Sequence, residues 1–122
     1  MSKCYSELFE PIRIGTVTLK NRYVMAPMAS FGIVDQQGIL TDDGIEYFVT
    51  RARGGIGLIM TGTCFVDDVV EQIVPKTLMC TERTDRWREM QQFNRLAERI
   101  HAYGSKIFIQ LAAGDGRSAR IP

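Results

Sequence analysis

The sequence is short of the residues that build disulfide frameworks, metal centres and membrane spans. Its 122 residues include three cysteines and one histidine. Cys4, Cys64 and Cys80 are widely spaced and form no C-x-x-C pair, so they predict reduced thiols, neither a disulfide framework nor a zinc site. No apolar run approaches the roughly 20 residues that a membrane-spanning helix needs. We therefore expect neither a bound metal nor a membrane segment.

An excess of charge of one sign is also missing. Fifteen basic and fourteen acidic residues leave a formal net charge of +1, which predicts neither nucleic acid nor a membrane surface as a partner. Glu7 comes before any apolar run, which argues against a secretory signal and predicts a cytoplasmic protein. No repeat, low-complexity tract or linker divides the chain, so residues 1–122 are expected to belong to one domain.

The apolar pattern predicts a hairpin followed by strands that alternate with helices. Residues 12–14 and 17–19 alternate in polarity around Gly15-Thr16, which indicates a short hairpin. Three compact apolar runs predict buried strands: residues 23–26, 57–61 and 106–111. This order predicts a parallel sheet with right-handed crossovers. It fits an open doubly wound sheet and the first third of a barrel equally well.

Two amphipathic helices are expected between these strands. Thr41 can cap the first helix, whose apolar residues recur at i, i+3, i+4 and i+7 from Ile45 to Ala52. Gly54-Gly55 ends this helix. A long loop is expected over residues 64–83.

The second helix is the clearest element of the pattern. Thr84 or Asp85 begins it and Gly104 ends it. The charged residues of the segment 83–99 are expected on the outer face, in contact with water. The expected inner stripe consists of Trp87, Met90, Phe93, Ala97 and Ile100.

In both candidate folds the functional site lies at the carboxyl ends of the strands. The residues there are Pro27-Met28-Ala29, Gly62-Thr63 and Gln110, none of which is a strong acid, base or nucleophile. Small residues let backbone groups approach a planar heteroaromatic ring, and an amide can pair with adjacent donor and acceptor atoms. Tight turns at the mouth of a barrel need the same residue types, so spacing alone leaves both interpretations open.

Other motifs carry weaker signals. Gly114–Ala119 fits G-x-G-x-x-A after the third strand, a pattern typical of dinucleotide-binding turns. The following helix and acidic residue that would support it are not found before residue 122, and two βα units precede it. Asp67, Asp68 and Glu71 lack a metal-binding spacing and predict a solvated loop. His101, in the last turn of the second helix, suits the negative end of the helix dipole.

Four stretches match a known family in order and spacing along almost the whole chain. They are Leu8-Phe9-Glu10-Pro11-Ile12; Leu19-Lys20-Asn21-Arg22 with Val24-Met25-Ala26-Pro27-Met28; Tyr47 with Arg51-Ala52, Gly54-Gly55 and Gly57-Leu58-Ile59; and His101-Ala102-Tyr103-Gly104 with Gln110-Leu111 and Gly116-Arg117. Together they resemble the old yellow enzyme family of FMN-dependent oxidoreductases. The resemblance implies an α/β fold, the N-terminal portion of a TIM (β/α)8 barrel with an N-terminal hairpin and about three of the eight strands.

The resemblance also implies FMN at the carboxyl ends of the strands, with NADH or NADPH as reductant. The reaction would be reduction of an activated C=C bond in a small unsaturated carbonyl compound, by hydride transfer from flavin N5. Gln110 would hydrogen-bond the pyrimidine edge of the flavin, and Phe31 would lie near the substrate. The positions that would bind FMN are Pro27, Met28, Ala29, Gly62, Thr63 and Gln110.

Two positions depart from the pattern of many family members. Ala29 stands where many have Thr or Cys, and Ala113 stands where many have histidine. The variant Gln110–Gly114 is more similar to the bacterial branch of 2,4-dienoyl-CoA and enoate reductases. Members of that branch carry a 4Fe-4S cluster and a second, FAD-binding domain beyond the barrel.

The family's paired substrate-binding residues and its proton-donating tyrosine would lie beyond Pro122, so no catalytic residue is assigned. Because three strands cannot close a barrel, we expect the 122-residue chain alone to be inactive and to bind FMN weakly or not at all. It is expected to aggregate or to need a partner. The sequence does not decide whether that partner is a second copy of the chain. The alternatives are a doubly wound dinucleotide-binding domain that uses Gly114–Ala119, and a non-catalytic truncated product.

Overall fold

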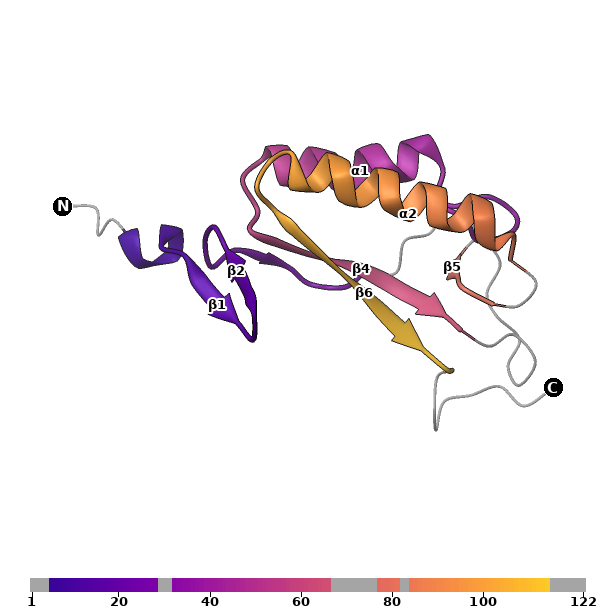
Figure 1. The fold of residues 1–122 in the computed structure, drawn as a ribbon, viewed down its shortest axis with the longest axis horizontal. Coiled ribbons are helices and arrows are strands. Elements are labelled where there is room, and N and C mark those ends of the chain that lie inside the picture. Colours follow the sequence, from indigo (N-terminus) through magenta and orange to yellow (C-terminus); the bar gives the residue numbers. More distant parts are fainter. Residues whose placement is uncertain (1–4, 29–31, 67–76, 82–83, 115–122) are drawn as a thin grey trace.

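A computed structural model describes residues 5–28, 32–66, 77–81 and 84–114. A hairpin at one end is followed by a parallel sheet with both α-helices on the same face (Figure 1). The elements are η1 (Ser6–Phe9), β1 (Ile12–Ile14), β2 (Val17–Leu19), β3 (Val24–Met25), α1 (Asp42–Arg53), β4 (Leu58–Phe65), β5 (Leu78–Met79), α2 (Arg86–His101) and β6 (Lys106–Ala112).

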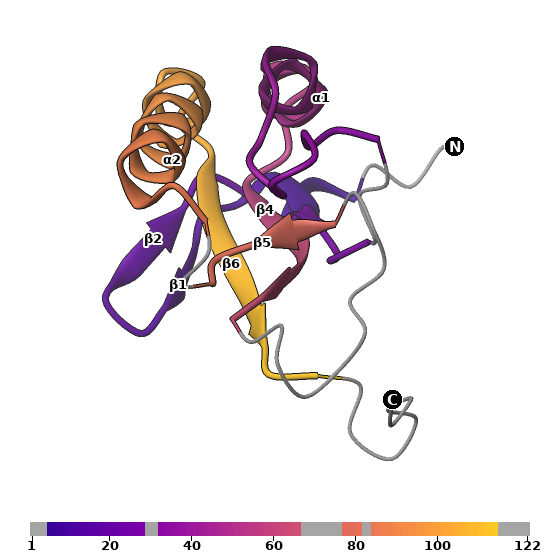
Figure 2. The same cartoon turned by 90° about the vertical axis from the view of Figure 1, so that its right-hand side faces the viewer.

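β4 is the central strand of the sheet. β3 and β5 pair with opposite ends of β4, and β6 pairs along its length, all in parallel. Seen from the end of the molecule, α1 and α2 lie side by side above the sheet (Figure 2). The predicted hairpin and the parallel α/β order are confirmed. The described residues show no more of a barrel than this, so its closure stays a prediction.

The strand boundaries differ from the prediction in three places. β3 is limited to Val24 and Met25, and it is buried on one face only, because the Val24 side chain is 47% exposed. β4 continues to Phe65, so Gly62 and Thr63 lie inside the strand. β5 lies within the predicted loop, because its pairing with the end of β4 overrides the weak local signal.

Local signals at the ends of α1 act as expected. The Thr41 side chain accepts a hydrogen bond from the main-chain N–H of Gly44 at 3.1 Å, which caps the first turn. Gly54 follows the last helical residue, and its N–H donates to main-chain oxygens of the final turn. Among the described residues, no helix combines the length and hydropathy that a bilayer crossing requires.

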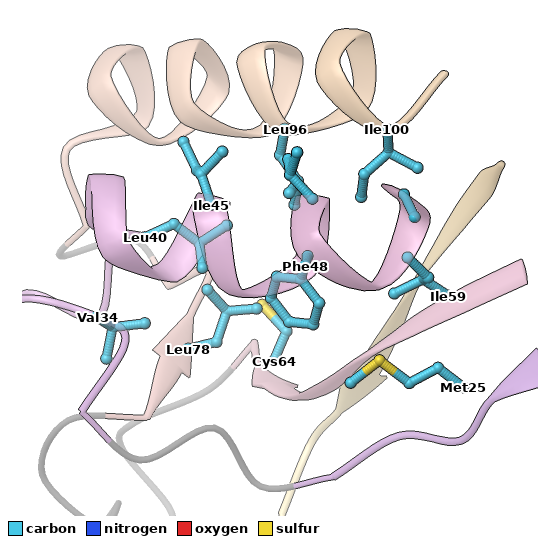
Figure 3. Close-up of a cluster of buried hydrophobic side chains, with 12 residues drawn as sticks. Met25, Val34, Leu40, Ile45, Phe48, Ile59, Cys64, Leu78, Leu96 and Ile100 are labelled. Atoms are coloured by element: carbon cyan, nitrogen blue, oxygen red, sulfur yellow. The ribbon is translucent and has the colours of Figure 1, made fainter. Parts of the chain in front are cut away.

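The core lies between the helices and the sheet (Figure 3). Side chains from both helices, β3, β4, β5 and the segment before α1 meet there. Its buried members are Met25, Val34, Leu40, Ile45, Phe48, Val49, Ala52, Ile59, Cys64, Leu78, Leu96 and Ile100.

The inner face of α2 differs from the predicted stripe. Trp87 is 74% exposed and Met90 is 61% exposed, so neither belongs to the core of the described chain. The residues buried on α2 are Glu89, Leu96 and Ile100, with Phe93 partly buried against the core. They recur at helical spacing, and Trp87 lies about 200° around the helix from Glu89. The prediction holds at Phe93 and Ile100 and fails at Trp87 and Met90, because it assigned the charged Glu89 to the outer face.

Ion pairs join α2 to α1 and to the segment before α1. In each pair an acidic residue faces an arginine 53 positions later in the chain. The pairs are Asp35–Arg88, Asp42–Arg95 and Glu46–Arg99. The hydrogen bond from Arg99 holds the pKa of the Glu46 carboxyl below its ordinary value. The charges predicted to face only water are therefore partly used between the helices.

Candidate functional site

β4 carries an irregularity where the sequence placed the functional site. Met60 pairs with Phe108 and Thr63 pairs with Gln110, so β4 has one extra residue between the two pairs. This is a β-bulge, a feature that is over-represented next to active sites. Ile59 and Cys64 both lie in the helix-facing core although they are five positions apart. Regular alternation would place residues five positions apart on opposite faces of the sheet. After the bulge, therefore, the odd and even positions of β4 exchange the faces to which their side chains point.

Thr61 compensates for the hydrogen bond that the bulge disrupts. Its side chain is completely buried, and its Oγ1 accepts a hydrogen bond from the main-chain N–H of Gln110 at 3.2 Å. A hydroxyl thus replaces the carbonyl partner that a regular ladder would provide. This contact fixes the main chain of β6 at Gln110.

We expect Thr61→Val to loosen this point of the sheet. Valine keeps the shape of the side chain but removes the acceptor, so the Gln110 N–H loses its partner at a cost of about 1–2 kcal/mol. The Gln110 amide should exchange with deuterium roughly tenfold faster or more. Thr18→Val in β2, where the side chain is exposed, is the matched control. Unchanged protection of Gln110 in Thr61→Val would contradict this role.

The bulge brings two of the predicted FMN residues side by side. Thr63 and Gln110 are register partners on neighbouring strands. Thr63 adjoins the core residue Cys64, and Gln110 is three positions from Ile107, which packs on the core. Both side chains therefore lie on the sheet face opposite the helices. The Gln110 side chain is exposed and Thr63 is half-buried.

The remaining predicted site residues have less definite places. Gly62 is buried within the bulge. Pro27 is half-buried and Met28 exposed, and both follow β3, on the opposite side of β4 from Gln110. Ala29 and Phe31 lie outside the described residues, as do Asp67, Asp68, Glu71 and most of the Gly114–Ala119 motif.

Cavities open at the other end of the sheet. One of about 480 Å³ is lined by residues of β2, His101 at the end of α2 and the start of β6. Another of about 320 Å³ is lined by Phe9, Asn21, Tyr23, Gly54, Gly55 and Ile56. Neither lining includes a predicted FMN residue, so these cavities are not the candidate site.

Lys20 and Asn21 form hydrogen bonds that join segments at the end of the sheet where β4 and β6 begin. The Asn21 amide donates to the Gly55 carbonyl at 2.7 Å, and its oxygen accepts from the Tyr23 N–H at 3.1 Å. The Lys20 ammonium donates to the carbonyl of Tyr103, after α2, at 2.6 Å. These contacts join the hairpin to the turns that follow both helices.

The sequence pattern did not predict a role for two buried polar residues near the carboxyl end of β4. Thr61 carries no motif, and only its pairing with β6 reveals its role. Glu89 lies on the buried face of α2 and is 5% exposed. Its Oε1 has no hydrogen-bond partner among the described residues. Glu89 precedes Phe93, Leu96 and Ile100 at helical spacing, but its charge made it read as an outer residue in the sequence.

Residues 7–120 match the family model described as NADH:flavin oxidoreductase / NADH oxidase family. The chain is 43% identical over 117 residues to cinnamate reductase of Clostridium sporogenes, covering 96% of this chain and 17% of that protein. It is 34% identical over 119 residues to NADPH dehydrogenase of Listeria monocytogenes, covering 96% and 33%. The chain thus spans at most a third of the length of these relatives.

Solved structures agree with this match. Old yellow enzyme from Pichia sp. AKU4542 superposes with a TM-score of 0.73 at 30% identity, over 86% of this chain and 26% of that one. A 2-naphthoyl-CoA reductase superposes with a TM-score of 0.79 at 26% identity, over 96% and 17%. The resemblance seen in the four sequence stretches is confirmed, and the chain belongs to the NADH:flavin oxidoreductase / NADH oxidase family.

Proposed function

We propose that this chain forms part of the FMN-binding site of an NAD(P)H-dependent reductase that acts on activated C=C bonds. The observation that carries the proposal is the pair formed by Thr63 and Gln110 beside the bulge of β4. The substrate class is supported by the similarity to cinnamate reductase, whose name denotes an unsaturated carboxylate.

The chemistry of these side chains fits a flavin. The Gln110 amide offers a donor and an acceptor side by side, which suits the alternating N–H and C=O groups of the pyrimidine edge. Thr63 adds a hydroxyl that can donate or accept. Gly62 has no side chain to obstruct the approach of a ring to the main chain. None of these groups carries a charge, as expected for contacts with a neutral ring.

The residues of this chain bind and orient, whereas bound FMN would supply the hydride-transfer chemistry. Thr61 holds the main chain of Gln110 in place and so fixes where the amide can lie. Pro27 restricts the backbone after β3. The exposed Met28 offers a polarisable apolar side chain for contact with an aromatic surface.

A chimera tests this proposal most directly. We would replace the matching segment of Clostridium sporogenes cinnamate reductase with this chain and measure FMN binding by flavin absorbance and fluorescence. The chimera is expected to bind FMN. Gln110→Leu should weaken binding about tenfold, the effect of losing about one hydrogen bond.

The control for this variant is Gln91→Leu, which removes an exposed amide on α2. Equal FMN affinities in the two variants would contradict the role of Gln110. Failure of the FMN-loaded chimera to reduce 2-enoates would reject the substrate class while leaving the cofactor assignment in place.

A further inference from the structure

Two cysteines meet at the carboxyl end of β4. Cys64 pairs with Leu78 of β5, and the N–H of Cys80, just after β5, donates to the Phe65 carbonyl at 2.8 Å. Residues two apart in an extended segment share a face, so Cys80 lies on the same side of the sheet as Leu78 and Cys64. The two thiols form a hydrogen bond with each other and are not joined by a disulfide.

Glu89 completes this cluster from the first turns of α2. The Cys80 thiol hydrogen-bonds to the Glu89 carboxyl, which is 5% exposed. Burial of a carboxylate is costly unless strong partners surround it, and a thiol is a weak donor. Oε1 has no hydrogen-bond partner in the part of the chain described. A buried oxygen left in this state calls for an explanation beyond packing.

The cluster suppresses ionisation of both thiols. Burial raises the pKa of Cys64 to about 12. The hydrogen bond to Glu89, followed by burial, raises the pKa of Cys80. Because the thiolate is the reactive form of cysteine, both effects favour the reduced pair. Cys80 is nevertheless exposed, so a small oxidant can reach it.

We propose that Cys64 and Cys80 are a dithiol that a hydroperoxide converts to a disulfide, and that Glu89 is the positioning residue that slows this conversion. Cys80 sulfur first attacks the peroxide, the O–O bond breaks, and a sulfenic acid forms. Cys64 sulfur then displaces the hydroxyl of the sulfenic acid as water. With hydrogen peroxide, two thiols and one peroxide give one disulfide and two waters, and two electrons pass from sulfur to oxygen. The step involves no flavin and does not depend on the proposed function.

Peptide mapping of the full chain after hydrogen peroxide treatment tests the pairing. We would use a Cys4→Ser background to remove the third thiol, confirm helical structure by circular dichroism, and digest without reductant. The expected product is a peptide that links Cys64 and Cys80, formed more slowly in the folded chain than in guanidinium chloride, where burial and Glu89 no longer hold the thiols protonated. In Cys64→Ser, Cys80 should stop at a sulfenic acid that dimedone traps. A rate of linkage in the folded chain that equals or exceeds the rate in the unfolded chain, or no linkage, would overturn the proposal.

Glu89→Gln tests the role of the carboxyl. Loss of its negative charge should speed disulfide formation roughly threefold for a tenfold gain in thiolate, because nucleophilicity falls as the thiolate becomes easier to form. Glu98→Gln, at an exposed position of the same helix, is the control and should react like the parent. A rate for Glu89→Gln that is no higher than for Glu98→Gln would overturn the part assigned to Glu89.

Discussion

Replacing Phe48 with alanine is expected to lower the free energy of unfolding by about 4 kcal/mol. Phe48 is 1% exposed at the centre of the core, where its ring meets the Tyr47 ring edge-on at 5.1 Å between centroids. Alanine would leave a cavity that two helices and a sheet cannot easily close. Such a loss is a large fraction of the 5–15 kcal/mol that typically stabilises a domain. Urea unfolding followed by far-ultraviolet circular dichroism would measure it.

Trp87→Ala is the matched control for this variant. Although tryptophan is the larger residue, its side chain is mostly exposed on α2, so we expect a change within about 0.5 kcal/mol. The sequence pattern predicts a large loss at both positions, whereas the structure predicts a large loss at Phe48 alone. A loss at Trp87 comparable to that at Phe48 would show that this face of α2 is covered in solution.

Gly44→Ala should destabilise the chain by about 3 kcal/mol, although alanine at a helix position ordinarily stabilises by about 1 kcal/mol. A β-carbon at Gly44 would lie well under 3.0 Å from the Ile33 carbonyl oxygen. That oxygen is held by two hydrogen bonds from Thr41, at 3.1 Å from the main-chain N–H and 3.0 Å from the hydroxyl. The clash therefore falls on a backbone that cannot yield without loss of the N-cap.

Gly54→Ala at the other end of the same helix separates this clash from a general effect of the substitution. A β-carbon there would meet main-chain oxygens at 3.4 and 3.5 Å, which ordinary packing tolerates. We expect its free energy of unfolding to stay within about 0.5 kcal/mol of the parent. Equal effects at the two glycines would contradict the close approach of Ile33 to α1.

The hairpin, both helices and the parallel order could be predicted because each depends on neighbours in sequence. Thr41 caps α1 through a residue three positions away, and the apolar period of α1 matches its buried face. The family could also be recognised, because its four stretches keep their order and spacing. These signals do not require knowledge of which strands pair.

The features that could not be predicted depend on contacts between distant segments. The bulge exists because β4 pairs with β6 in two different registers, and Thr61 supports it through Gln110, 49 positions away. The inner face of α2 was misplaced because a buried glutamate has no apolar signature. The burial of Glu89 is explained only by its hydrogen bond with Cys80, which belongs to another segment.

The ion pairs along the two helices have a consequence for alignment. Their spacing is seven residues and then four on both partners, so only one alignment of the segments forms all three pairs. Slippage of α2 by one turn would bring Arg99 to Asp42, leave Asp35 without an arginine and leave Glu46 with only Arg53 of its own helix. Exposed pairs of this kind add little to stability, about 1 kcal/mol or less each. Their contribution is to favour the native register of α2 against α1 over a register shifted by one turn.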